Sequence, residues 1–323
     1  MTASPASIPE RPLLKPWYRL LFTPAGLMLE HGRSVVTFTG SAARSFLPAL
    51  LPLLDGSRTV TGLVDAVGTN VAPAVENALS LLAAQDLITD GPALDDQLDA
   101  GRRATVELLA AETGASPSSL CKRLENGRVR FLAQRRLDER LARILHEAGL
   151  DAVGIAQGEE VGPEELVVLS VPPEPAQLDD WNRTALERGI TWLPFGSYDG
   201  RTATVGPLVV PHETACVECL HIRRRSTSGC QAELAELRHV GFRCAPSPDL
   251  ELVVAGLAAR IVVRWLLLRD PLLPGLLVTI DGNSEPSVST HLTLRVPRCP
   301  VCSGLSSVAP PAPWHEPRVE ASA

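Results

Sequence analysis

Two pairs of cysteines have the spacing of metal-binding knuckles. Each pair is separated by two residues, Cys216 with Cys219 and Cys299 with Cys302. Two intervening residues let both thiolates face one ion, and two such pairs supply the four soft ligands of a closed tetrahedral zinc site. Because a four-thiolate site keeps no open position for water or substrate, we expect its zinc to stabilise the fold rather than to catalyse a reaction.

The alternatives for these thiols are a redox dithiol or a pair of disulfides. The sequence has no thioredoxin-like strand and helix around either pair and no signal for an oxidising compartment, so both alternatives are disfavoured. Three further cysteines, Cys121, Cys230 and Cys244, are predicted to be buried apolar side chains or spare thiols. Cys230 and Cys244 follow the first pair closely enough to remain alternative ligands.

Length and charge set the broad class. The chain has 323 residues, enough for two domains, and its net charge of -7 gives no electrostatic reason to expect nucleic acid. The N-terminus does not resemble a signal sequence, so we expect a cytoplasmic protein. Residues 250–268 are almost wholly apolar but contain Glu251, Arg260 and Arg264. This segment is predicted to be a buried helix or a homodimer interface rather than a membrane span.

The first third of the chain is predicted to fold as a small domain over residues 17–90, after a Pro-rich lead-in over residues 1–16 that we expect to be disordered. Three strands, three helices and a closing strand are predicted in order at residues 20–22, 27–30, 34–39, 41–54, 59–67, 71–85 and 86–88. Ser41 is the candidate N-cap of the first helix, and either Thr61 or Thr59 is the candidate N-cap of the second. This order predicts a winged helix-turn-helix, a fold whose common use is DNA binding.

The charges of this domain disfavour DNA. Residues 26–90 contain six carboxylates against three arginines, and the predicted recognition helix, residues 71–85, carries Glu76 and no Lys or Arg. A helix in the major groove needs cations and hydrogen-bond donors. An open strand edge beside an apolar helix instead suits capture of a peptide as an added strand. The predicted peptide-binding residues are Ser34, Val35, Val36, Thr37, Phe38, Ala74, Asn77, Ala78 and Leu81. The alternative for the helix positions is that they belong to the core.

Strands and helices alternate in the second domain, residues 105–307, which follows a polar linker over residues 91–104. Helices are predicted at residues 105–113, 118–125, 137–148 and 178–188, and strands at residues 128–134, 149–155, 166–170, 191–195, 202–210, 276–281 and 287–296. This alternation predicts a parallel sheet wound with helices. From residue 308 the Pro-rich tail is expected to be disordered.

The turn after the first of these strands lacks the glycines of a nucleotide site. Phosphate must approach the backbone amides of the next helix, which requires glycine at the turn. The turn here, residues 133–138, contains no glycine. Glu159 and Glu160 are weak candidates for binding a ribose, and Arg135 and Arg136 could attract an anion. We therefore predict a Rossmann-like fold that has lost its nucleotide site, with no ATP bound to this chain.

Several segments together resemble a known family. They are Gly206-Pro207-Leu208-Val209-Val210-Pro211 before the first cysteine pair, Asp281-Gly282, and Arg298 directly before the second pair. They resemble the ThiF-like relatives of ubiquitin-activating enzymes, and in particular the ocin-ThiF-like proteins of azole-containing ribosomal peptide biosynthesis. Residues 17–90 are similar to the PqqD-like peptide-recognition domain of the same pathways. The two resemblances cover most of the chain.

This resemblance implies a function without chemistry on the present chain. In that family the recognition domain binds the leader of a precursor peptide as an added strand. The ThiF-like body docks on a separate YcaO cyclodehydratase, which uses ATP to form thiazolines and oxazolines. The alternatives are an ATP-dependent adenylating enzyme that acts on a peptide carboxylate and, third, a zinc-stabilised DNA-binding regulator.

Overall fold

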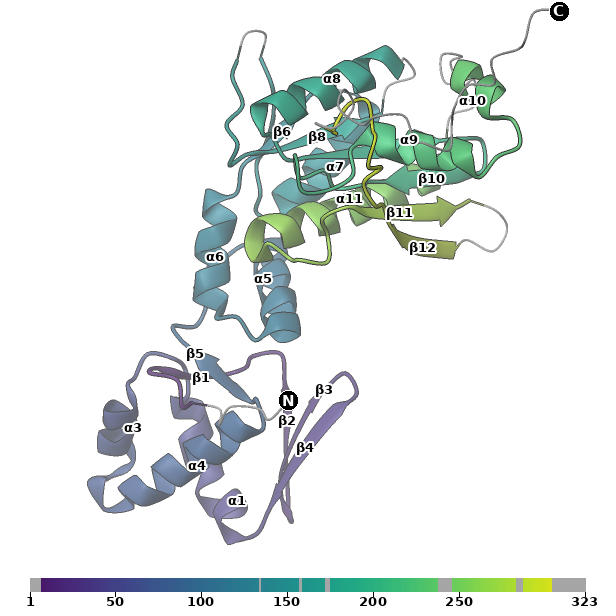
Figure 1. Ribbon diagram of the computed structural model, residues 1–323. Coiled ribbons are helices and arrows are strands. Elements are labelled where there is room, and N and C mark those ends of the chain that lie inside the picture. The colour runs from purple at the N-terminus through teal and green to yellow at the C-terminus, as the bar shows by residue number, and fades with distance from the viewer. Residues whose placement is uncertain are drawn as a thin grey trace, which may run out of the picture. The chain divides into compact units, whose positions relative to one another are not determined.

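The computed structural model describes residues 7–133, 135–156, 159–171, 175–237, 246–282 and 287–303 (Figure 1). The chain divides into two compact units. The first comprises Met1–Asn126 with Glu147–Leu150, and the second comprises Gly127–His146 with Asp151–Ala323. The predicted disordered tail, Cys244 and the end of the strand predicted at residues 128–134 lie outside the described residues.

The first unit contains two small antiparallel sheets. β2 (Arg19–Thr23), β3 (Gly26–His31) and β4 (Ser34–Thr39) pair in that order, as the sequence predicted for its first three strands. A second sheet joins β1 (Pro12–Leu14) to β5 (Ile88–Asp90). The expectation of disorder over residues 1–16 is therefore wrong for β1. Its Leu13 is buried, and the backbone of Leu14 bonds to Leu54.

Four helices of the first unit pack against the buried side of β3. They are α1 (Ser41–Ser45), α2 (Leu47–Leu50), α3 (Val60–Val67) and α4 (Ala72–Ala84), with short 3-10 turns at Leu51–Leu53 and Thr69–Val71. Two further helices, α5 (Ala100–Thr113) and α6 (Pro117–Asn126), pack against each other. Leu27 and Leu29 of β3 share one core with Leu63, Leu79 and Leu82. α5 begins inside the predicted linker because the Asp99 carboxylate caps it.

The single helix predicted over residues 41–54 is wrong. The chain forms α1, α2 and a 3-10 turn there instead. Pro48 and Pro52 explain the interruptions, because proline has no N–H to continue a helical hydrogen-bond series. Ser41 is not an N-cap either, since Gly40 holds that position with φ of 102°. Because the helix is interrupted, Phe46 lies between α1 and α2 and not on the apolar face of one continuous helix.

The second unit is built on one seven-stranded sheet among the described residues. Its order is β12 (Ser287–Leu292), β11 (Leu276–Asp281), β10 (Thr202–Val205), β9 (Trp192–Tyr198), β8 (Leu166–Ser170), β6 (Val129–Phe131) and β7 (Ala152–Gly154). The strands from β9 to β7 are parallel and the other three antiparallel. The predicted α/β class is confirmed, with an antiparallel extension that the helix-strand alternation did not reveal.

Five described helices accompany this sheet: α7 (Arg136–Glu147), α8 (Pro175–Arg188), α9 (Val217–Ser226), α10 (Gln231–Leu237) and α11 (Pro248–Leu268) (Figure 1). α11 buries most of its apolar side chains within the unit. Its Glu251 is only 6% exposed and forms ion pairs with Arg136 at 2.6 Å and Arg140 at 3.2 Å. None of the helices in the described part of the chain combines the length and apolarity that a bilayer crossing requires.

Two candidate caps allow a matched test of the fold. The Thr59 hydroxyl accepts a hydrogen bond from the Gly62 N–H at 3.2 Å, whereas Ser41 caps no helix. We expect Thr59→Ala to lower the free energy of unfolding of the first unit by about 1 kcal/mol, because an orphan helix donor loses its partner. Ser41→Ala should change it by a few tenths at most. Urea denaturation followed by circular dichroism measures the free energy of unfolding of both variants. Equal losses in the two variants would contradict the assignment of Thr59 as the N-cap of α3.

Candidate functional site

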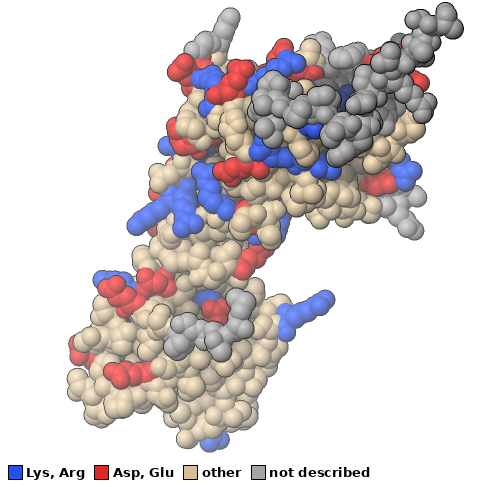
Figure 2. All heavy atoms as spheres, in the orientation of Figure 1, with Lys and Arg blue, Asp and Glu red and all other residues tan. Residues whose placement is uncertain are grey.

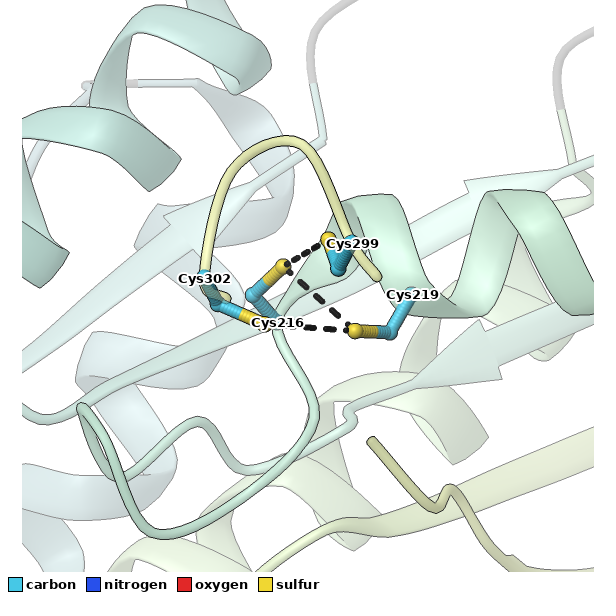
Figure 3. Close-up of side chains that lie close together, drawn as sticks. All are labelled: Cys216, Cys219, Cys299 and Cys302. Carbon is cyan, nitrogen blue, oxygen red and sulfur yellow. Dashed lines mark hydrogen bonds between the residues drawn. The ribbon is translucent and has the colours of Figure 1, made fainter. Parts of the chain in front are cut away.

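The two cysteine pairs meet in one buried cluster, as Figure 3 shows. The Sγ atom of Cys216 lies 3.9 Å from that of Cys219 and 3.7 Å from that of Cys299, and Cys219 lies 3.4 Å from Cys302. All four residues are buried. The ligand set predicted from spacing is thus brought together from segments more than 80 positions apart.

Local structure positions both pairs. Cys216 is the N-cap residue of α9 and Cys219 lies in its first turn, so both thiols face the same side. The second pair follows β12 and is held by Arg295, whose guanidinium donates to the Cys302 carbonyl at 2.7 Å and to that of His212. Arg223 of α9 donates to the Leu294 carbonyl at 2.7 Å. These contacts join α9 to the C-terminal loop independently of any ion.

The cluster has the chemistry of a metal site. A tetrahedral site with metal–sulfur distances of about 2.3 Å places its sulfurs about 3.8 Å apart, close to the observed separations. They are too long for disulfides, whose sulfurs lie about 2 Å apart. Burial raises the pKa of the Cys216 thiol, so a thiolate there needs a cation to compensate its charge. The four cysteines can hold a metal ion.

The other sulfur and basic residues near the first pair do not join this cluster. Cys230 is exposed, and Cys121 lies in α6 of the first unit. The three arginines that follow His221 all have partners: carbonyls for Arg223, Asp199 for Arg224 and Glu218 for Arg225. They do not form a free cationic face.

A second group of ligand-type side chains was missed from the sequence. Asp179 of α8 lies close to Glu218 and His221 of α9. Arg225 donates to Glu218 at 3.0 Å, so part of the charge in this group is already compensated. These residues come together only because α8 packs against α9, and no spacing in the sequence predicts that packing.

A groove of about 330 Å³ runs beside β4 in the first unit. Its walls come from the end of β4, from α1 and α2, and from α4. It is lined by Phe38, Thr39, Ala42, Ala43, Phe46, Leu47, Ala74, Asn77, Ala78, Leu81 and Leu82. No strand covers the outer side of β4 within the described residues, because the sheet ends there.

The helix positions predicted for peptide binding, Ala74, Asn77, Ala78 and Leu81, all line this groove. Of the predicted strand residues only Phe38 lines it, and the other four, Ser34, Val35, Val36 and Thr37, form the adjoining open strand. The contribution of α1 and α2, above all Phe46, was missed because one continuous helix was expected there. Leu81 is 50% exposed, so it is not a core residue, whereas Ala78 is 7% exposed and also belongs to the core of the unit.

Apolar side chains occupy the carboxyl ends of the parallel strands, where a Rossmann-type nucleotide would lie. Leu132 and Ala133 after β6, Ile155 after β7, Val171 after β8 and Trp181 of α8 pack on one core. Arg135 donates to the Val171 carbonyl at 3.5 Å. Among the described residues, this end of the sheet offers no glycine-rich turn.

Polar groups at this end of the sheet are bound to one another. The Asp138 carboxylate accepts hydrogen bonds from Ser170 at 2.7 Å and from the Arg135 N–H at 3.0 Å. Burial raises the pKa of Asp138 even though both hydrogen bonds oppose that change. Glu159, a candidate for ribose, accepts from the Ala156 N–H at 2.9 Å and pairs with Arg130.

Comparison with known proteins identifies relatives of the fold. No protein-family model matches the sequence, and no curated protein does. Among solved structures, the chain is similar to the heterocyclase TruD, with 22% identity and a TM-score of 0.69 over 91% of this chain and 43% of TruD. A heterocyclase in complex with substrate and cofactor matches at 21% identity and a TM-score of 0.69, over 90% of this chain and 39% of that one.

A third similar structure is MccB of E. coli with ATP, at 16% identity and a TM-score of 0.61 over 90% of this chain and 99% of MccB. The chain therefore shares its fold with proteins of the heterocyclase and MccB type. It spans only about two fifths of the length of the two heterocyclases.

The cysteine cluster gives a direct prediction. We expect the purified chain to contain one tightly held metal ion, and Cys299→Ser to lose it, because the tetrahedral site then lacks one of its four thiolate ligands. Loss should lower the melting temperature by about 10 °C. Elemental analysis and thermal denaturation measure both effects. Cys230→Ser is the control, since this exposed thiol lies outside the cluster, and equal metal content in both variants would contradict the assignment.

Proposed function

We propose that this chain binds the leader of a ribosomally made precursor peptide and presents it to a separate YcaO cyclodehydratase that forms thiazolines or oxazolines. The observation that carries the proposal is the groove between α4 and the open edge of β4. The fold likeness to a heterocyclase in complex with its substrate supports it. In this proposal residues 17–90 are a winged-helix, PqqD-like recognition domain and residues 105–307 a ThiF-like body.

The backbone of β4 suits an added strand. β3 and β4 are joined by a two-residue turn, Gly32-Arg33, and pair from His31 with Ser34 onward. In an antiparallel pair with this turn, every second residue of β4 forms its backbone hydrogen bonds with β3. The N–H and C=O groups of the residues between them, Val35 and Thr37, therefore point to the open edge. A peptide strand there would satisfy these groups and lay alternate side chains over the groove.

The other edge of the sheet is a competing surface. β2 exposes Leu20, Leu21 and Phe22, of which Leu21 and Phe22 are each 52% exposed. The groove at the end of β4 offers a wall for the side chains of a bound strand, and no residue of β2 lines that groove. This difference favours β4, and it makes β2 the natural control.

The second unit is proposed to be non-catalytic. The apolar packing of Leu132, Ile155 and Val171 leaves little room for a nucleotide, and the turn before α7 has no glycine. The alternative function is ATP-dependent adenylation of a peptide carboxylate, which the likeness to MccB with ATP favours. DNA binding is the least supported, because α4 presents Glu76 and no cation.

We propose zinc as the ion of the cysteine cluster, with a structural role. Four thiolates are a ligand set that zinc prefers, and they leave no position for water. Bound zinc would fix α9 against the loop that follows β12. The proposed partners of the whole chain are the leader peptide and the YcaO protein. A homodimer through α11 would depend on Leu252 and Val253, which remain exposed on that helix.

Strand addition can be tested by removing one outward N–H group. Thr37→Pro deletes an edge donor without cutting the bonds between β4 and β3, since edge positions with outward N–H groups tolerate proline. We expect it to weaken binding of a fluorescein-labelled precursor leader that the unmodified chain binds by about tenfold or more, measured by fluorescence polarisation.

The control is Leu20→Pro, which removes an outward donor from β2 instead. It should bind the leader like the unmodified chain. A loss with Leu20→Pro and none with Thr37→Pro would move the site to the other edge, and circular dichroism excludes loss of fold in either variant.

The role of ATP separates the two main candidate functions. We expect the isolated chain to release no pyrophosphate from Mg-ATP with or without the leader, because the ends of β6, β7 and β8 are filled by apolar side chains. Pyrophosphate added to the same reaction serves as the positive control of the assay. Leader-dependent pyrophosphate release by this chain alone would establish the adenylating alternative.

A further inference from the structure

We propose that two copies of this chain pair through β12, so that their seven-stranded sheets join into one continuous sheet across a twofold axis. The inference concerns the second unit and does not depend on leader binding at β4. It is carried by an open strand edge, by an apolar layer that continues onto this edge, and by a strand sequence that is complementary to itself.

β12 is an edge strand without the features that usually protect an edge. It forms one end of the sheet, and no described strand pairs with its outer side (Figure 1). All six of its residues are exposed. Proteins commonly protect such edges with charged residues, prolines or very short strands. Residues 287–293 contain no Lys, Arg, Asp, Glu or Pro, whereas β7 at the opposite end of the sheet has only three residues. β12 is therefore the edge of this sheet that is suited to pairing.

The backbone of β12 points half of its hydrogen-bonding groups to the open side. The Thr293 N–H donates to the Gly275 carbonyl at 2.9 Å, in line with the register of β11 and β12. In an antiparallel pair, residues that bond to the neighbouring strand alternate with residues whose groups point away from it. The N–H and C=O groups of Val288, Thr290 and Leu292 therefore point to the open edge.

The side chains of these same three residues lie on one face of the sheet, because alternate residues of a strand share a face. There they adjoin Val278 and Ile280 of β11, which are both buried. Val288 is 54% exposed and Leu292 is 64% exposed. The apolar layer of the sheet thus continues to its edge and ends in water. A further strand beside β12 would shield these side chains.

The order of residues in β12 favours a second copy as that further strand. Two identical strands related by a twofold axis run antiparallel. With Thr290 on the axis, Val288 of each copy faces Leu292 of the other, so the apolar side chains are paired. The three residues with outward backbone groups then form three bonded pairs of two hydrogen bonds each. A shift by two residues would place Thr290 opposite an apolar residue instead.

The charge distribution is compatible with self-association. The edge itself is neutral, so two copies of β12 do not repel each other. In the view of Figure 2, positive and negative side chains are interspersed over the described part of the second unit that this view shows. This face therefore does not present a large patch of one sign, which would attract a charged partner and repel a second copy.

A pair of edge strands makes a small interface. The free edge does not extend past Thr293, because the Leu294 carbonyl already accepts a hydrogen bond from Arg223 at 2.7 Å. Stable complexes bury about 1,200 Å² or more, and one short strand pair covers less than that. We therefore expect a dissociation constant in the micromolar range, so that the fraction of dimer changes with protein concentration.

The first test is sedimentation velocity of the full chain from about 1 to about 200 μM, over which the average mass should rise from monomer toward dimer. Thr290→Pro removes the outward N–H at the axis and keeps the bonds to β11, so it should raise the dissociation constant about tenfold or more. Circular dichroism should show an unchanged fold. A chain that stays monomeric throughout would overturn the inference and leave this edge to a strand of another protein.

The second test identifies the partner as a copy of the same chain. One variant combines Val288→Lys with Leu292→Lys, and another combines Val288→Glu with Leu292→Glu. In the proposed register like charges face each other when either variant is alone, and opposite charges face each other in a mixture. We expect monomers from each variant alone and dimers from the equal mixture at low salt. A mixture that stays monomeric would overturn the proposed pairing.

The matched control combines Leu252→Lys with Val253→Lys on α11, which adds the same charge at two exposed apolar side chains. Dimers should persist in this variant with an unchanged dissociation constant. Loss of the dimer here, together with a dimer that survives Thr290→Pro, would place the interface on α11 and overturn the inference. Because β4 is unaltered in all these variants, leader binding can be measured separately in each of them.

Discussion

A strand at the edge of a sheet leaves a row of backbone N–H and C=O groups without protein partners, and the functional account of this chain depends on that row. Within the described residues no strand covers the outer edge of β4, and a groove adjoins the end of this strand at Phe38 and Thr39. Water can satisfy them, but a second strand satisfies them in a fixed register. The apolar wall of α4 then adds contacts that water cannot make. The proposed peptide capture would thus need only an unpaired edge and its neighbouring helix.

The second unit differs from the first in that two of its buried carboxylates are paired and its four cysteine ligands form a closed set. Glu251 is buried between Arg136 and Arg140, and Asp138 is bound by Ser170. The four cysteines connect α9 to the loop after β12. Such an arrangement retains the sheet of a nucleotide-binding fold while its strand ends are filled.

Much of this structure could be predicted from the sequence, and the misses have definite physical causes. Periodicity located β8, β11 and α4 within a residue or two, and the cysteine spacing predicted the ligand set. β1 was missed because a three-residue strand in a Pro-rich segment has no periodicity, and its partner β5 lies more than 70 residues away. The prediction of one helix over residues 41–54 was wrong because it gave more weight to the helical spacing of apolar residues than to the two prolines in this segment. Groove residues such as Phe46 depended on that break and could not be named.

The measurement that tests the central claim most directly is hydrogen exchange of the β4 amides, read by NMR with and without the bound leader. Strand addition predicts that the outward amides of Val35 and Thr37 exchange much more slowly in the complex, while those of Leu20 and Phe22 on β2 are unchanged. Saturating leader that leaves the β4 amides unprotected, or that protects β2 instead, would contradict the account.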